Sequence, residues 1–112
     1  MPFIKNIEQD KVLSLAEEIH AQSGQIVSKT LAQNDAVSVT LFAFSKGEEI
    51  GTHSSEGDAM VYILEGTGRF TVGGKAHLCK AGDVLVMPAG IPHAVYAEEN
   101  FKWLLTVVFP LD

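Results

Sequence analysis

Basic residues and long apolar runs are both scarce in this chain of 112 residues. Eight Lys and Arg stand against 14 Asp and Glu, which gives a net charge of −6 at pH 7. Proteins that bind nucleic acid or an anionic membrane surface need clustered basic residues, and those of this chain are scattered. No apolar run approaches the roughly 20 residues of a membrane helix. We therefore expect neither nucleic acid nor a membrane as a partner.

Cysteine is nearly absent as well. The single cysteine, Cys79, excludes an internal disulfide and is typical of a reducing compartment. The amino terminus, residues 1–6, lacks the basic region and apolar stretch of a signal peptide. We therefore expect a cytoplasmic protein. The length allows one domain, and 46% hydrophobic with 20% charged residues is an ordinary globular composition.

Helical periodicity is confined to the N-terminal segment. Asn6 and Gln9, three residues apart, predict an N-terminal cap, and Gly24 is expected to end the stretch. We expect a short helix that covers the open end or one edge of a sheet, with a strand over 17–20 as the alternative. The apolar residues recur at steps of three and four: Val12, Leu15, Ala16 and Ile19.

From residue 25 onward the chain alternates short strand-like stretches with turns. Residues 37–44 alternate side chains, and the nearly apolar residues 59–65 predict a strand buried on both faces. Gly73-Gly74 predicts a two-residue hairpin. In the stretch after it we expect Leu78 to face the core and His77 the solvent. Many short strands about 8–12 residues apart indicate an antiparallel sandwich or barrel. Further strands are predicted at 69–72, 75–79, 84–87 and 101–109.

Glycines, prolines and histidines form a two-part signature. The first part is Gly47-x5-His53 followed by Gly66, and the second contains Gly82, Pro88, Gly90 and His93. With this spacing the chain resembles, over about residues 37–109, the cupins, which are small β-barrels that hold a metal ion in the barrel mouth. The resemblance implies an all-β, cupin-type double-stranded β-helix (a jelly-roll barrel) with a short N-terminal helix. We expect one domain over 1–112, in which segment 1–24 packs on a barrel of about 25–110.

The resemblance implies four metal ligands, of which this chain carries two. His53 and His93 are in register, but Ser55 replaces a second His and Ala59 replaces a Glu. A hydroxyl is a poor ligand for a first-row metal, and a methyl group is none. We expect at most a weakly held divalent ion (Zn, Ni, Mn or Fe). The alternative is a metal-free pocket in which the two His form hydrogen bonds, and the sequence leaves both open.

Strand parity predicts which residues face the barrel interior. Residues two apart share a face, so His53 and Ser55 point the same way. Parity turns Asp58 away from the interior, and Glu56 lies in the rim loop, so neither is a good third ligand. The residues expected to line a ligand pocket are Ser55, Ala59, Val61, Met87 and Val95.

Two functions are compatible with the sequence. Neither of them assigns catalytic residues. The first is a barrel that binds a small molecule, with or without a divalent ion at His53 and His93. The alternative is a metal-dependent oxygenase or isomerase acting on a small organic substrate. Loss of the carboxylate favours the first, because it removes a ligand and the best proton acceptor. We also expect a homodimer, since a small barrel presents apolar sheet surface and edge strands.

Overall fold

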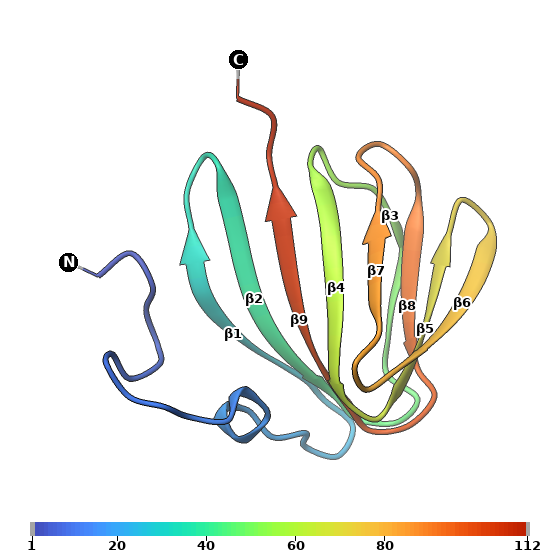
Figure 1. The fold of residues 1–112 in the computed structure, drawn as a ribbon. Coiled ribbons are helices and arrows are strands. Elements are labelled where there is room, and N and C mark those ends of the chain that lie inside the picture. The colour runs from blue at the N-terminus through green and yellow to red at the C-terminus, as the bar shows by residue number, and fades with distance from the viewer. Residues whose placement is uncertain (1, 112) are drawn as a thin grey trace.

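The computed structural model describes residues 2–111, which form nine strands and a single short helix (Figure 1). The helix, η1, is a 3₁₀ helix at Leu15–Glu18. The strands are β1 (Ile26–Gln33), β2 (Val37–Phe44), β3 (Glu49–His53), β4 (Asp58–Glu65), β5 (Thr67–Val72), β6 (Lys75–Lys80), β7 (Val84–Met87), β8 (His93–Ala97) and β9 (Phe101–Val108).

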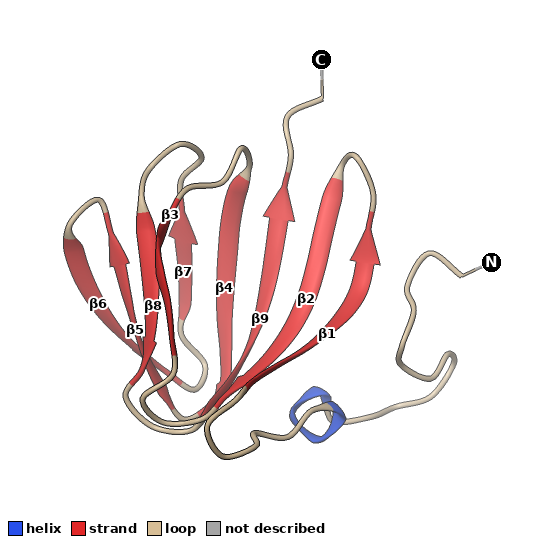
Figure 2. Cartoon of the chain, turned by 180° about the vertical axis from the view of Figure 1, so that it is seen from behind, coloured by secondary structure: helices blue, strands red, loops and turns tan. Residues whose placement is uncertain are grey.

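The strands form two antiparallel sheets that face each other. One has the order β1-β2-β9-β4-β7 and the other β3-β8-β5-β6. The sheets converge at one end and diverge at the other, which forms the barrel mouth (Figures 1 and 2). The β3–β4 and β7–β8 loops lie at the mouth, as does the tight turn at Gly73-Gly74, whose positive φ angles of 55° and 84° glycine adopts without strain. The all-β prediction is confirmed.

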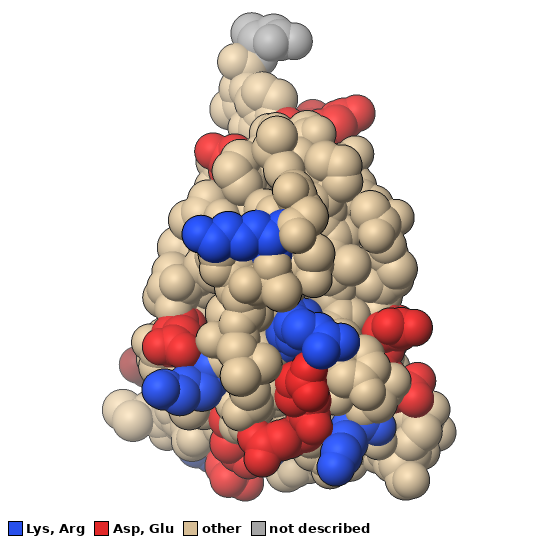
Figure 3. Space-filling model, turned by 90° about the vertical axis from the view of Figure 1, so that its right-hand side faces the viewer, with Lys and Arg blue, Asp and Glu red and all other residues tan. Residues whose placement is uncertain are grey.

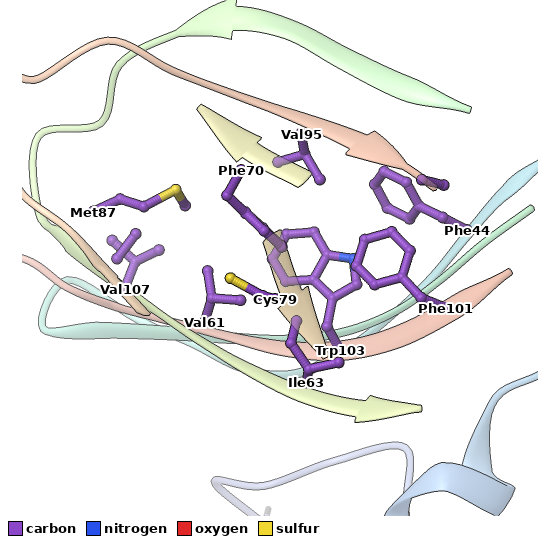
Figure 4. Close-up of a cluster of buried hydrophobic side chains, with 12 residues drawn as sticks. Phe44, Val61, Ile63, Phe70, Cys79, Met87, Val95, Phe101, Trp103 and Val107 are labelled. Carbon is purple, nitrogen blue, oxygen red and sulfur yellow. The ribbon is translucent and has the colours of Figure 1, made fainter. Parts of the chain in front are cut away.

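The inner faces of both sheets bury an aromatic core at the closed half of the barrel (Figure 4). Trp103 is 1% exposed, stacks on Phe42 with ring centres 4.7 Å apart, and meets Phe70 edge-on at 5.2 Å. Phe44 and Phe101 complete the cluster. Burying each such ring stabilises the fold by about 2–3 kcal/mol, so this half of the barrel forms the rigid floor beneath the mouth.

The N-terminal helix is shorter than its periodicity suggests. It begins after Ser14, which makes no side-chain capping hydrogen bond. The predicted cap is wrong, because Asn6 lies eight residues earlier and its side-chain amide donates instead to the Thr30 carbonyl at 2.6 Å. The alternative strand over 17–20 is also wrong, since residues 17 and 18 are helical. Within residues 2–111, no helix is long and apolar enough to cross a membrane.

The N-terminal segment covers part of the outer face of the five-stranded sheet. Ile19 packs with Leu31, Leu41 and Ala43 in a second buried cluster. The Lys102 ammonium of β9 donates to the Ala16 carbonyl at 2.6 Å, which fixes the helix to the sheet. The partly buried residues added by this segment are Ile7, Leu15 and Ala21.

Two burial predictions fail on the outer faces. Strand β4 buries one face only, because the N-terminal segment leaves Met60 (44% exposed) and Tyr62 (40% exposed) uncovered. In β6 the parity is opposite to the one predicted: Leu78 is 68% exposed, while Cys79 is buried and His77 half-buried. His77 pairs with the fully buried Phe70 and therefore shares its inward face.

Gly68 in β5 permits close packing of the aromatic core. A Cβ at this position would lie 2.5 Å from the ring of Phe101, which is itself enclosed. We expect Gly68→Ala to lower the free energy of unfolding by about 3 kcal/mol. The matched control is Gly51→Ala, whose added Cβ meets nothing within 4 Å. Urea denaturation of both variants checks this, and equal stabilities would contradict the packing.

Candidate functional site

The two histidines of the signature lie side by side at the barrel mouth. His53 ends β3, His93 begins β8, and the two residues are direct register partners in the four-stranded sheet. Pro88 and Pro92 lie in the β7–β8 loop that precedes His93, where their fixed φ angles restrict the loop.

A β-bulge in β3 directs His53 inward. Ile50 pairs with Val95 and His53 with His93, so three steps along β3 match two along β8. Without the extra residue, alternation would place Ile50 and His53 on opposite faces. With it, both side chains line the same cavity. The bulge is therefore the local feature that brings the two imidazoles together.

The hydrogen bonds of the two rings define their tautomer. His53 Nδ1 lies 2.9 Å from the Gly51 carbonyl oxygen, and His93 Nδ1 lies 3.2 Å from that of Ile91. A carbonyl oxygen only accepts, so each Nδ1 must donate a proton, and the Nε2 of each neutral ring carries a lone pair. Within residues 2–111, neither Nε2 has a hydrogen-bond partner. The ring centres are 4.2 Å apart, at an interplanar angle of 71°.

The two rings differ in their surroundings. His93 is 4% exposed, whereas His53 is exposed at the rim. Burial lowers the pKa of His93 below its usual value and the neighbouring His53 lowers it further, while the hydrogen bond to Ile91 opposes both effects. His93 is therefore held as a neutral ring at neutral pH, with its lone pair available as an acceptor or metal ligand.

Beneath the histidines lies a largely apolar cavity of about 300 Å³. Both sheets contribute to its walls, and Trp103 with Phe42 forms the aromatic part. The residues that line it are Phe42, Ile50, His53, Ser54, Ser55, Ala59, Met87, His93, Val95, Trp103, Leu105 and Val107.

Four of the five residues named as pocket residues lie on this lining, namely Ser55, Ala59, Met87 and Val95. The fifth, Val61, is fully buried in the core and does not line the cavity. Val61 is the next inward-facing residue of β4 after Ala59. At that depth the core is already filled by other side chains. That these residues contact a ligand stays a prediction.

Sequence reasoning did not place Ile50, Leu105 and Val107 on the cavity wall. Leu105 and Val107 share the parity of Trp103 along β9, so alternation from the single Trp could have identified them. Ile50 could not be assigned, because the bulge beside it breaks the alternation.

Two polar side chains near the histidines, Ser55 and Asp58, already form hydrogen bonds. The Ser55 hydroxyl accepts from the Gly57 N–H at 3.2 Å, and a carboxylate oxygen of Asp58 accepts from the Ala89 N–H at 2.8 Å. The Gly90 N–H donates to the Ser55 carbonyl at 2.9 Å, which joins the two mouth loops. These bonds hold the rim in place but add no third nitrogen or carboxylate beside the imidazoles.

The donor set fits an ion held by two imidazoles and does not fit a three-ligand metal centre. Within residues 2–111, no group of three or more His, Cys, Asp or Glu is placed to hold a metal. Rings 4.2 Å apart are compatible with two nitrogens each about 2 Å from one ion. Water or a ligand would have to supply the other coordination positions.

Trp103 is not a donor to the cavity. Its indole Nε1 is the one buried side-chain polar atom within residues 2–111 without a hydrogen-bond partner. Figure 4 shows this nitrogen on the side of Phe44 and Phe101, opposite the cavity-lining Met87 and Val107. The ring centres of Phe44 and Trp103 are 5.6 Å apart at an interplanar angle of 62°, an arrangement in which an aromatic face can accept a weak N–H contact.

Comparisons with known proteins agree on the architecture. The family model of the cupin domain matches residues 40–109. A conserved protein of unknown function from Streptococcus pyogenes is 47% identical, with a TM-score of 0.97 over 100% of this chain and 98% of that chain. A cupin superfamily protein from Desulfitobacterium hafniense is 34% identical, with a TM-score of 0.91 over 96% of this chain and 98% of that chain.

A cupin 2 conserved barrel domain protein from Leptotrichia buccalis is 46% identical, with a TM-score of 0.84 over 86% of this chain and 47% of that chain. No curated protein matches the sequence. These similarities confirm the jelly-roll barrel that the two-part signature predicted.

Proposed function

The chain belongs to the cupin family, and from this premise we propose that it binds a small, largely apolar molecule in the barrel cavity. The observation that carries the proposal is the pair of Nε2 lone pairs at the head of an aromatic-lined cavity of about 300 Å³. Apolar walls with a few convergent polar atoms are typical of small-molecule sites. The walls would hold the body of the ligand, and His53 and His93 its polar group.

A divalent ion is a second way to use the same two nitrogens. Histidines that bind metals commonly donate their other ring N–H to a carbonyl or carboxylate, and both rings here donate to carbonyls. We propose that Zn, Ni, Mn or Fe binds here weakly, with water or the ligand completing its coordination.

An ion held in this way would permit one alternative function, that of a metal-dependent oxygenase or isomerase. When bound, the ion would polarise an oxygen of the substrate. The chain's own contribution would be to hold the ion through His53 and His93 and to exclude water with the walls around Phe42 and Trp103. The missing third ligand favours ligand binding as the main proposal.

The single Trp provides a direct assay of the main proposal. Trp103 forms part of the cavity wall, so a molecule that enters should change its fluorescence. We expect phenol to give a saturable change in chelator-treated protein, and Ala59→Phe, which fills the cavity, to abolish it. If phenol gives no change in the wild type, the proposed function fails.

We also propose that a second copy of the chain covers the exposed part of the five-stranded sheet. Strand β7 is an edge strand whose outward side chains, Val84 and Val86, lie beside Met60 and Tyr62 of β4. None of these four side chains is charged, so two copies can meet here despite a net charge of −6. The free edge adds unpaired backbone groups that a partner strand can satisfy.

Val86→Lys tests this interface. A lysine at the centre of an apolar contact would be desolvated without a partner, so we expect the variant to sediment as a monomer at micromolar concentration. The matched control, Val12→Lys, alters a 98% exposed valine of the N-terminal segment and should leave the dimer intact. A wild-type protein that sediments as a monomer would overturn the interface.

A further inference from the structure

The barrel mouth contains three open hollows that all include Glu56. One lies beside Asp35 and Phe109, a second beside Asp58 and Val108, and the third, of about 750 Å³, beside Ser54 and Ala89. The loop that carries Glu56 therefore lies at the centre of the rim.

The largest of these hollows shares two lining residues with the histidine cavity. Ser54 and Ser55 line both of them, so the two spaces adjoin at these residues. A small molecule that reaches His53 and His93 from this side passes the Glu56 carboxylate. The negative charge of Glu56 therefore acts on every ligand that enters through this hollow.

The charged side chains that line these spaces are all acidic, although the exposed Lys75 follows the Gly73-Gly74 turn elsewhere at the mouth. No Lys or Arg of residues 2–111 lines the cavity or the three hollows, whereas Asp35, Glu56 and Asp58 do. Within the same residues, Asp35 and Glu56 form no ion pair. On the face shown in Figure 3, the charged atoms nearest the top are red, one blue side chain lies a little below them, and red and blue are mixed further down.

The interior would also reject an anion. At its head, the Nε2 atoms in the neutral rings of His53 and the 96%-buried His93 present lone pairs, because each Nδ1 faces a carbonyl oxygen. A carboxylate there would face two acceptors, and the neutral hydroxyl donors among the lining side chains of residues 2–111 are Ser54 and Ser55. Burying an anion without a cation is costly. A hydroxyl, amide N–H or ammonium group would donate to the same atoms.

We propose that the site selects uncharged or cationic aromatic molecules with a hydrogen-bond donor and rejects the corresponding carboxylates. The inference rests on the proposed ligand-binding function and assigns its ligand class. The donor would bond to His53 and His93, the ring would lie against Phe42 and Trp103, and Glu56 at the rim would favour cations.

The test compares three ligands with one aromatic ring and different charges. Phenol, benzylamine and benzoate are titrated into chelator-treated protein at pH 8 and low ionic strength, with Trp103 fluorescence as the readout. A cavity of about 300 Å³ accommodates a single ring. We expect benzoate to bind at least about tenfold more weakly than either of the others. Benzoate binding as tightly as phenol overturns this inference and leaves ligand binding intact.

Glu56→Gln isolates the contribution of the rim. We expect it to lower the affinity for benzylamine relative to phenol about two- to threefold, since the charge lies at the solvent-exposed rim. The control Glu99→Gln makes the same charge change in the β8–β9 turn at the closed end and should leave the ratio unchanged. If Glu56→Gln and Glu99→Gln change the ratio of the benzylamine and phenol affinities equally, the assignment to Glu56 is overturned. If phenol does not bind, the proposed function itself fails.

Discussion

Ser55→His with Ala59→Glu is expected to raise the affinity for Zn²⁺ about 100-fold or more over the wild type. Both positions line the cavity that contains His53 and His93, so the new imidazole and carboxylate would face the same space. A site with four protein ligands no longer depends on water or ligand for most of its coordination. Isothermal titration with Zn²⁺ alone measures the change.

Met60→Glu is the matched control for the new carboxylate. It adds the same group one residue further along β4, on the exposed outer face, and should leave the affinity for Zn²⁺ unchanged. If the double variant bound no more tightly than the wild type, Ser55 and Ala59 would not lie around a common metal position with the two histidines.

His93→Ala is expected to remove Zn²⁺ binding and to weaken phenol binding about tenfold. His93 is the buried member of the pair, and its Nε2 is the acceptor that a ligand donor would reach inside the cavity. Loss of one buried hydrogen bond, about 1–2 kcal/mol, corresponds to this change in affinity. Zinc titration and Trp103 fluorescence measure the two effects.

His77→Ala is the control for loss of an imidazole. His77 is half-buried in β6 and does not line the cavity, so both affinities should stay at the wild-type values. Urea denaturation of the His93 variant establishes that it is folded. A folded His93→Ala protein with undiminished binding would contradict the assigned role.

The strands were predictable where local chemistry alone decides them. Paired glycines at 73 and 74 predicted one hairpin. Alternation predicted β2, and the turn residues on either side predicted β7, both at their observed bounds. The failures occur where tertiary packing decides. The parity of Leu78 depends on which face of β6 meets Phe70, and the exposure of Met60 depends on how far the N-terminal segment reaches.

The candidate site was predictable only where motif spacing or strand parity determines it. Motif spacing and parity named His53 and His93, which the structure brings into contact. Parity also placed Val61 on the inward face, as observed, but parity does not give depth along β4, and at the depth of Val61 the core is filled. The bulge between Ile50 and His53 left no signal in the sequence, since it is defined only by the register against β8.

Nitrogen NMR of the two imidazoles tests the central claim most directly. The account predicts that the neutral rings of His53 and His93 carry their proton at Nδ1, with a bare Nε2 in each. Addition of phenol, or of Zn²⁺ alone, should then shift both Nε2 resonances and leave those of His20 and His77 in place. Protons on Nε2 of the neutral rings in the free protein, or Nε2 resonances that neither addition moves, would contradict it.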